Sequence, residues 1–504
     1  MISFAEKLSF LMHITETSNK ELAAELSVDP SMVSLMRTGK RRLSKKPIQV
    51  RKMALFFAKR SPAAFQRQAL SEMLGQVSIS PSMPTEVLAS SLENWLQGKS
   101  DTIADTILSG IQALPDLPQP APIRPTPAPA SENQTLFFYG EEGRREVMSR
   151  MMQEMQQMET PGTILTVVDD NLEWLLSDYL LTKKIQSGFL ELSERGFTVY
   201  QIMPTLNYIN RYAESLQFWL PIYATGQIKV YYYPRLRGNL YRHSIMVVPG
   251  CCVQYTCAVA TGSTSDITMF STDPQLVSAF EKQFQEHIAL CRPSLNAHQD
   301  PRDFLPCFLE LFSRQGNTIQ AVNSLSINSM PRELLEQLVR DAGTSDWAAG
   351  YKIHLEELPH FEERLRHAPY IDMCWLSSAA EVRSGTVPVV AFSKEYSGFL
   401  CYTPETYCLH LKNILRLMEQ YENYFFLPLD KKERPGYNLF VNEGGLALIV
   451  RTVEPFILLE IRQTAMITAL QEHLLKKADA VGYDGIHREK VRMKLRSLIQ
   501  ELGG

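Results

Sequence analysis

The chain has 504 residues, enough for two to four domains of about 100 to 200 residues, and carries a formal net charge of −4. Its composition, 45% apolar and 21% charged, excludes a disordered or collagen-like chain. No stretch reaches the roughly 18 uncharged apolar residues of a membrane helix, and the N-terminus lacks the pattern of a secretory signal. We therefore expect a cytoplasmic protein without a membrane partner.

The charge is distributed unevenly. Residues 1–60 contain twelve Lys and Arg against five Asp and Glu, a charge of +7, so the remaining residues must sum to −11. Residues 37–60 contain ten basic residues and no acidic one. This split indicates a small polyanion-binding head on a large acidic body.

Residues 1–75 read as a small helical domain. A helix is expected at 5–14, and Ser18 followed by Glu21 forms a capping box that predicts a second helix at 19–26. These elements open the predicted head.

A third helix is predicted directly after a short break. Asp29 is placed as its N-cap, Pro30 at its first position and Gly39 at its end, and Lys40, Arg41 and Arg42 follow. Helix, tight turn, short helix and basic run is the order of a helix-turn-helix.

The segment "NKELAAELSVDPSMVSLMRTGKRRLS" resembles the helix-turn-helix of the Cro and phage C1-repressor family. The resemblance covers about 70 residues and implies that the third helix enters the major groove of double-stranded DNA. The positions that it implies as DNA-binding are Asn19, Ser31, Met32, Ser34, Leu35, Arg37, Thr38, Lys40, Arg41 and Arg42. Of these, the resemblance implies that Ser31, Met32 and Leu35 face base edges and that Asn19, Thr38, Lys40 and Arg42 meet phosphates. The base-facing positions lack the Gln, Asn or Arg usual there, so we expect contacts with thymine methyl groups, Arg37 or DNA shape to give specificity.

Two segments separate the head from the body. Residues 76–114 are predicted as a helical connector, and 115–135 as a proline-rich linker. Residues 115–129 contain seven prolines, which exclude a helix and favour an extended, semi-rigid spacer. A ligand for a proline-recognition domain is the alternative.

Residues 136–293 alternate apolar strands and helices, and predict a mixed α/β half-domain. Strands are expected at 163–168, 197–203 and 228–233, followed by a hairpin and a closing helix. The long segment 172–195 is expected to be mostly helix.

A second α/β half-domain is predicted at 300–480. Its strand at 424–429, its hairpin at 438–451 and its closing helix repeat the order of the first half, which indicates an internal duplication. The upstream part, 303–392, matches poorly and its fold stays open. Residues 481–504 are expected to form a C-terminal helix.

Half-domains of this type, paired about a pseudo-twofold axis, resemble the phospholipase D fold, and "YRHSIMVVPGCCVQYTCAVATGS" resembles its active-site strands. His243 and the pair Gly262 and Ser263 match that family's signature. Ile245 stands where the family has lysine and Gly250 where it has aspartate, and the second hairpin has no histidine. Phosphodiester cleavage needs these groups, so we expect a noncatalytic body.

Other catalytic patterns are absent from the sequence, including HExxH and GxSxG, and no CxxC pair marks a zinc site. We therefore expect no metal and no cofactor. A polar pocket for a small anionic ligand is the hypothesis for the first half-domain, and its members would be Asp169, Asp170, Arg211, Arg242 and His243. The alternatives are a helix cap for the aspartates and a solvated loop for the basic residues.

The sequence thus predicts a multidomain transcriptional regulator with an all-α DNA-binding head and an α/β sensor body. One such head reads only a few base pairs, so a homodimer is expected. The first alternative is a DNA-targeted phosphodiesterase or nuclease. The second is a DNA-tethered scaffold whose body binds protein.

Overall fold

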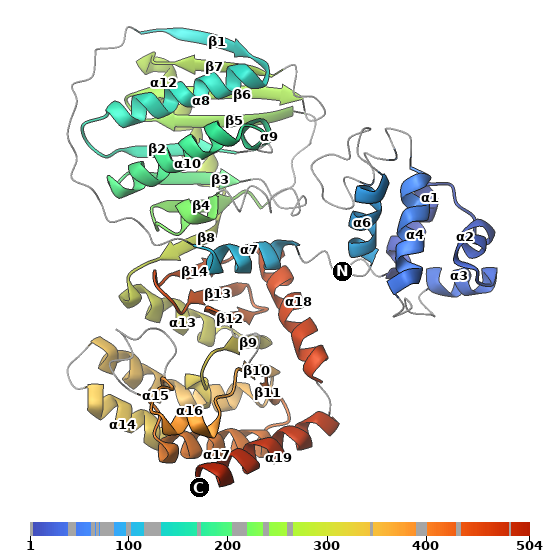
Figure 1. The fold of residues 1–504 in the computed structure, drawn as a ribbon. Helices are drawn as coiled ribbons and strands as arrows, with labels where there is room; N and C mark the ends of the chain where they lie inside the picture. The colour runs from blue at the N-terminus through green and yellow to red at the C-terminus, as the bar shows by residue number, and fades with distance from the viewer. Residues whose placement is uncertain are drawn as a thin grey trace. The chain divides into compact units, whose positions relative to one another are not determined.

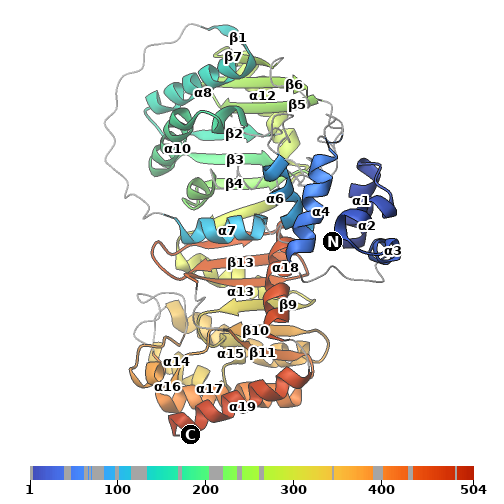
Figure 2. The same cartoon turned by 45° about the vertical axis from the view of Figure 1, so that its right-hand side comes forward.

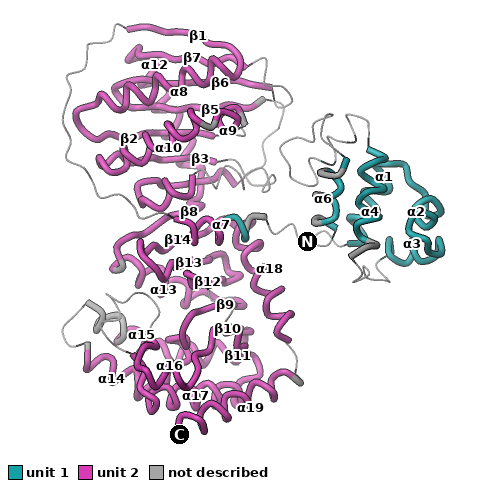
Figure 3. The backbone as a smooth tube through the Cα atoms, viewed as in Figure 1, with its two compact units in different colours: residues 1–106, 171–173, 206–216 teal, residues 107–170, 174–205, 217–504 magenta. Residues whose placement is uncertain are grey.

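The structure, a computed structural model, divides into two compact units (Figure 3). Unit 1 comprises 1–106, 171–173 and 206–216, and unit 2 comprises the rest. No helix in the described part of the chain is long and apolar enough to span a membrane. The structure describes residues 4–38, 47–61, 66, 70, 85–96, 102–114, 133–168, 173–203, 219–234, 241–259, 266–342, 346–389, 401–429, 435–482 and 485–503.

Unit 1 is helical, as the sequence predicts for residues 1–75. Its helices are α1 (Phe4–Ile14), α2 (Asn19–Leu26), α3 (Pro30–Arg37), α4 (Pro47–Lys59) and α6 (Thr85–Leu96). Leu8, Leu22, Val33 and Phe57 are fully buried in one core. Leu88 of α6 belongs to the same core, so the first half of the predicted connector packs as part of the head.

Unit 2 is an α/β body built on one fourteen-stranded sheet (Figure 1). The first seven strands are β1 (Thr135–Tyr139), β2 (Thr163–Val167), β3 (Thr198–Met203), β4 (Ile228–Tyr232), β5 (Tyr241–Val248), β6 (Cys252–Val259) and β7 (Ile267–Ser271). The next seven are β8 (Arg292–His298), β9 (Thr318–Val322), β10 (Tyr370–Cys374), β11 (Tyr424–Pro428), β12 (Tyr437–Asn442), β13 (Leu446–Arg451) and β14 (Leu458–Ile461).

The sheet contains the same strand order twice. It runs β1-β7-β6-β5-β2-β3-β4 and continues β8-β14-β13-β12-β9-β10-β11. Each half has a parallel trio, β2-β3-β4 or β9-β10-β11, and antiparallel strands beside it. The repeated hairpin and closing helix of the sequence therefore belong to a repeat of the whole strand order.

The two halves follow one another along the sheet. The last strand of the first half, β4, pairs with β8, the first strand of the second half, and runs antiparallel to it. The strand directions of the second half are thus reversed while the order is kept. Equivalent strands lie seven places apart in the sheet, and the expected pairing about a pseudo-twofold axis stays a prediction.

Helices cover both faces of the sheet (Figure 2). In the first half α8 (Gly140–Gln157) and α10 (Tyr179–Glu194) pack together, and α8 contacts β1, β6 and β7. The closing helix α12 (Pro274–Ile288) contacts β2, β5 and β6. The predicted helix at 172–195 is interrupted: α9 (Glu173–Leu176) ends before Asp178, whose carboxylate accepts the Leu181 N–H at 3.0 Å and caps α10.

The second half has more helices, including those of the segment whose fold the sequence left open. The closing helix α18 and the C-terminal helix α19 have the predicted order. The helices of the second half are α13 (Phe304–Ser313), α14 (Arg332–Ala342), α15 (Asp346–Arg364), α16 (Ala379–Arg383), α17 (Pro404–Gln420), α18 (Thr464–Val481) and α19 (Gly485–Leu502), and its short 3-10 turns are η1 (Pro301–Asp303) and η2 (Ile327–Ser329). A further helix, α7 (Thr102–Gln112), belongs to unit 2 from residue 107 onward.

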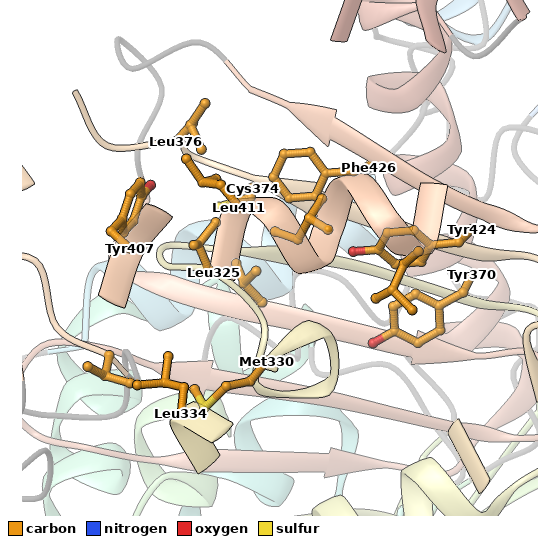
Figure 4. Packing of buried hydrophobic residues seen from close by; sticks show 14 of the residues in the cluster. Leu325, Met330, Leu334, Tyr370, Cys374, Leu376, Tyr407, Leu411, Tyr424 and Phe426 are labelled. Atoms are coloured by element: carbon orange, nitrogen blue, oxygen red, sulfur yellow. The ribbon is translucent and has the colours of Figure 1, made fainter. Parts of the chain in front are cut away.

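The core of the second half joins these helices to the sheet (Figure 4). Tyr424 and Phe426 on β11 and Leu411 on α17 are buried in it. Leu495 of α19 is fully buried in the same core, so the C-terminal helix is an integral part of this half. None of the eight cysteines, all of which lie in the described part of the chain, forms a disulfide.

Candidate functional site

Local capping fixes the start of α2. The Ser18 hydroxyl accepts the Glu21 N–H at 3.3 Å, and the Glu21 carboxylate accepts the Ser18 N–H at 2.8 Å. These hydrogen bonds and an ion pair with Arg60 at 2.9 Å hold the pKa of Glu21 at about 2. The predicted capping box is present.

The turn between α2 and α3 is three residues long. Ser27 adopts a left-handed conformation with φ 54° and ends α2, and the Asp29 carboxylate accepts the Ser31 N–H at 2.8 Å to begin α3 at Pro30. Hydrogen bonds from the Ser31 side chain and from its backbone N–H lower the pKa of Asp29. The two helices are thus joined by a tight turn in which the backbone of Ser27 ends α2 and the side chain of Asp29 begins α3.

One face of α3 is buried and the other is exposed. Val33 and Met36 are buried in the unit 1 core. The opposite positions Ser31, Ser34 and Leu35 are exposed, and Met32 is half-buried. The side chains predicted to face base edges therefore lie on the outward face of this helix, with Leu35 40% exposed.

Two of the predicted DNA-binding residues bind each other. The Arg37 guanidinium donates a hydrogen bond to the Asn19 amide oxygen at 3.0 Å, which joins the end of α3 to the start of α2. Thr38 donates its hydroxyl to the Ser34 and Leu35 carbonyls at 3.1 and 3.2 Å. In this arrangement the Thr38 hydroxyl donates its proton to backbone carbonyls of α3. Lys40, Arg41 and Arg42 lie outside the described residues.

The predicted ligand pocket is described only in part. Strands β2 and β5 are antiparallel neighbours with Val167 opposite Ile245, so the end of β2 lies beside the start of β5. Arg242 and His243 belong to that start of β5. Asp169, Asp170 and Arg211 lie outside the described residues, as do Gly262 and Ser263.

His243 has a partner on the neighbouring strand. Its Nδ1 lies 2.8 Å from the Tyr255 hydroxyl, and the two rings stack with centroids 5.8 Å apart. Burial raises the pKa of Tyr255. The tyrosine therefore stays protonated near neutral pH and can donate this bond to the imidazole.

The corresponding end of the second half is filled by an asparagine. Asn323, directly after β9, donates its N–H to the Asn438 amide oxygen and its side-chain amide to the Pro435 carbonyl, both at 2.8 Å. Asn323 is only 9% exposed. These hydrogen bonds tie the end of β9 to the chain at the start of β12.

Sequence reasoning missed a cavity of about 320 Å³ in the second half. It lies between η2, α14, α15 and α17, and its polar lining includes Asn328, Asn413 and Arg416. Arg416 pairs with Glu362, whose other carboxylate oxygen accepts the Tyr421 hydroxyl at 2.8 Å. The Arg416 guanidinium is therefore already paired with a carboxylate that also lines the cavity.

No family model matches the chain, and no curated protein matches it. Solved structures similar to part of it include NucT from Helicobacter pylori, 12% identical, with 32% of this chain and 99% of that chain covered and a TM-score of 0.24. Nuc from Salmonella typhimurium, a phospholipase D family member, is 14% identical, with 32% and 98% covered and a TM-score of 0.24. TrmBL2, an archaeal chromatin protein that binds DNA, is 13% identical, with 45% and 81% covered and a TM-score of 0.23. All three likenesses are weak.

Proposed function

We propose that the chain is a DNA-binding transcriptional regulator of the Cro and C1-repressor helix-turn-helix type, with a noncatalytic body that senses a small anionic ligand or a protein partner. The observation that carries the proposal is the helix pair α2 and α3. Both helices are capped by their own flanking residues, and α3 exposes one complete face. A short exposed helix positioned by a second one is what a major-groove reader requires.

Charge supports the same assignment. The basic residues Lys40, Arg41 and Arg42 follow α3 closely in the sequence with no acidic residue among them. Lys and Arg that neutralise phosphates release counterions, and this gives affinity for any duplex. Ser31, Met32 and Leu35 then have the role of contacting bases.

A noncatalytic body fits the residues present in both hairpins. A phosphodiesterase of the phospholipase D type needs two histidines and phosphate-binding lysines at one site. The first hairpin has one histidine, bound to Tyr255, and Ile245 in place of the lysine. The alternatives, a DNA-targeted nuclease and a DNA-tethered scaffold, share the head and differ only in the body.

The test is DNA binding by the full chain across a range of salt concentrations. Fluorescence anisotropy with a mixed-sequence duplex should give a steep fall of affinity with salt. The double variant Lys40→Ala with Arg42→Ala should lower the slope of log K against log salt by about two, because each phosphate contact contributes roughly 0.9.

A matched control removes two lysines from α4, where Lys52 and Lys59 are exposed. Lys52→Ala with Lys59→Ala has the same change in charge and should alter the slope by less than half as much. Equal effects of the two double variants, or unchanged binding in the first, would contradict the proposed interface.

A further inference from the structure

Three different metal-ligating side chains meet at the first strand of the second half. His298 ends β8, Glu460 lies on the neighbouring β14, and Cys307 lies in the first turns of α13. The His298 Nε2 is 3.2 Å from Glu460 Oε2 and 3.7 Å from Cys307 Sγ, and all three ligand atoms lie within 4.8 Å of one another. The spacing of residues in the sequence does not predict this set, because Glu460 is far along the chain from His298 and Cys307.

The separations suit a tetrahedral ion. Zinc binds nitrogen and oxygen at about 2.0 to 2.2 Å and sulfur at about 2.3 Å, so tetrahedral angles place nitrogen about 3.4 Å from oxygen and about 3.6 Å from sulfur. The observed 3.2 and 3.7 Å are close to these values. An ion fits between the three atoms with small side-chain adjustments.

Surrounding residues hold the carboxylate in place. The Asn296 amide donates to Glu460 Oε2 at 3.3 Å, and Arg462 pairs with Glu460 Oε1. Arg462 also pairs with Glu310, so its charge is shared between two carboxylates. Hydrogen bonds from outside a ligand set orient the ligands and tune their affinity. The side chain of His298 is 22% exposed, which gives an ion access from solvent, whereas that of Glu460 is 6% exposed.

We propose that His298, Cys307 and Glu460 bind a divalent transition-metal ion of the zinc class, with water in the fourth position. Imidazole, thiolate and carboxylate together select such an ion over Mg²⁺ or Ca²⁺, which prefer oxygen ligands alone. A bound ion links β8 to β14 and α13. Since β8 also pairs with β4, the site lies on the strand that joins the two halves of the sheet.

The test uses the full chain, freed of metal by a chelator, and Co²⁺ and Zn²⁺ as probes. One Co²⁺ ion should bind per chain and produce a sulfur-to-metal charge-transfer band, which reports a thiolate ligand directly. Cys307→Ser should abolish that band, and His298→Gln should weaken Zn²⁺ binding by more than about a hundredfold, beyond the 10- to 100-fold cost of losing an outer-shell partner.

Cys291→Ser is the matched control, because Cys291 directly precedes β8 and lies outside the set of three ligands. This variant should keep the band and the Zn²⁺ affinity. Circular dichroism of each metal-free variant distinguishes a lost ligand from a lost fold, and Glu460→Gln offers a second ligand change. A band that survives Cys307→Ser, or the absence of one-to-one binding by the parent chain, would overturn the proposal.

Discussion

At the scale of single residues, Asp372 on β10 is a fully buried carboxyl group in the core of the second half. Its two oxygens accept hydrogen bonds from the Gln320 amide at 2.7 Å and the Tyr424 hydroxyl at 2.9 Å. Burial outweighs these bonds and raises the pKa of Asp372 from 3.8 to about 6. Compared with the unfolded chain, the folded protein therefore binds the proton of this carboxyl group more tightly.

This raised pKa has a defined effect on stability. The contribution of Asp372 is complete below about pH 4 and is lost as the pH rises through 6, a loss of about 3 kcal/mol for two pKa units. Asp372→Asn should remove this dependence, so that the free energy of unfolding of the variant falls less between pH 4 and 7. Urea unfolding followed by tryptophan fluorescence measures the difference.

Tyr424→Phe provides a control of opposite sign. It removes one donor to the carboxylate, which should raise the pKa of Asp372 further and make the fall of stability with pH steeper. If Asp372→Asn and the parent chain showed the same dependence between pH 4 and 7, the carboxyl group would have an ordinary pKa in the folded state.

Single residues also show where sequence reasoning reached its limit at the candidate sites. The outward positions of α3 follow from helical spacing, because Val33 and Met36 mark the buried face. The Arg37 to Asn19 bond does not follow from spacing, since it joins two helices. The same holds for His298, Cys307 and Glu460, which come together through the pairing of β8 with β14 and the position of α13.

At the scale of elements, the two caps of the α2 and α3 pair are open to direct measurement. Ser18→Ala and Asp29→Ala each remove an acceptor for a backbone N–H at a helix start, and should each cost about 1 kcal/mol. Amides in the first turn of the affected helix should then exchange about fivefold faster, since RT is about 0.6 kcal/mol. Hydrogen exchange mass spectrometry of the full chain resolves the two helices.

Asp29→Asn is the control for the second cap, because asparagine caps a helix about as well as aspartate. Exchange in α3 should stay close to that of the parent chain in this variant. Equal acceleration by Asp29→Ala and Asp29→Asn would mean that charge at the helix start matters and the capping bond does not.

Strand prediction from the sequence succeeded for the hairpin β12 and β13 and failed for β9 and β10. The hairpin β12 and β13 has six buried residues in each strand, and the sequence predicted it within about one residue. Strands β9 and β10 are equally buried, yet Gln320 and Asp372 interrupt their apolar runs. The Gln320 amide donates a hydrogen bond to the Asp372 carboxyl group on the neighbouring strand, so each buried polar group has a partner. The sequence of a single strand cannot show this pairing.

At the scale of the whole molecule, the repeat was visible in sequence only where both halves are regular. The duplication was predicted from the similar hairpins and closing helices of the two halves. The relation between the halves depends on the pairing of β4 with β8, whose register shifts between Val230 and Tyr231. Pairing of one strand edge with another is set by tertiary packing and leaves no periodic signal in either strand.

The relation between the halves bears directly on catalysis. Equivalent strands β5 and β12 are seven places apart in one sheet, about 34 Å at roughly 4.8 Å per strand. Two hairpins so far apart cannot contribute to one phosphodiester site within a chain.

We therefore expect the purified protein not to hydrolyse a chromogenic phosphodiester, since His243 alone cannot act as both nucleophile and acid. Steady-state assays of the parent chain and of His243→Ala, purified side by side, measure this. Contaminating activity would be equal in both preparations, whereas turnover present in the parent and lost in His243→Ala would show that the first half is an active phosphodiesterase.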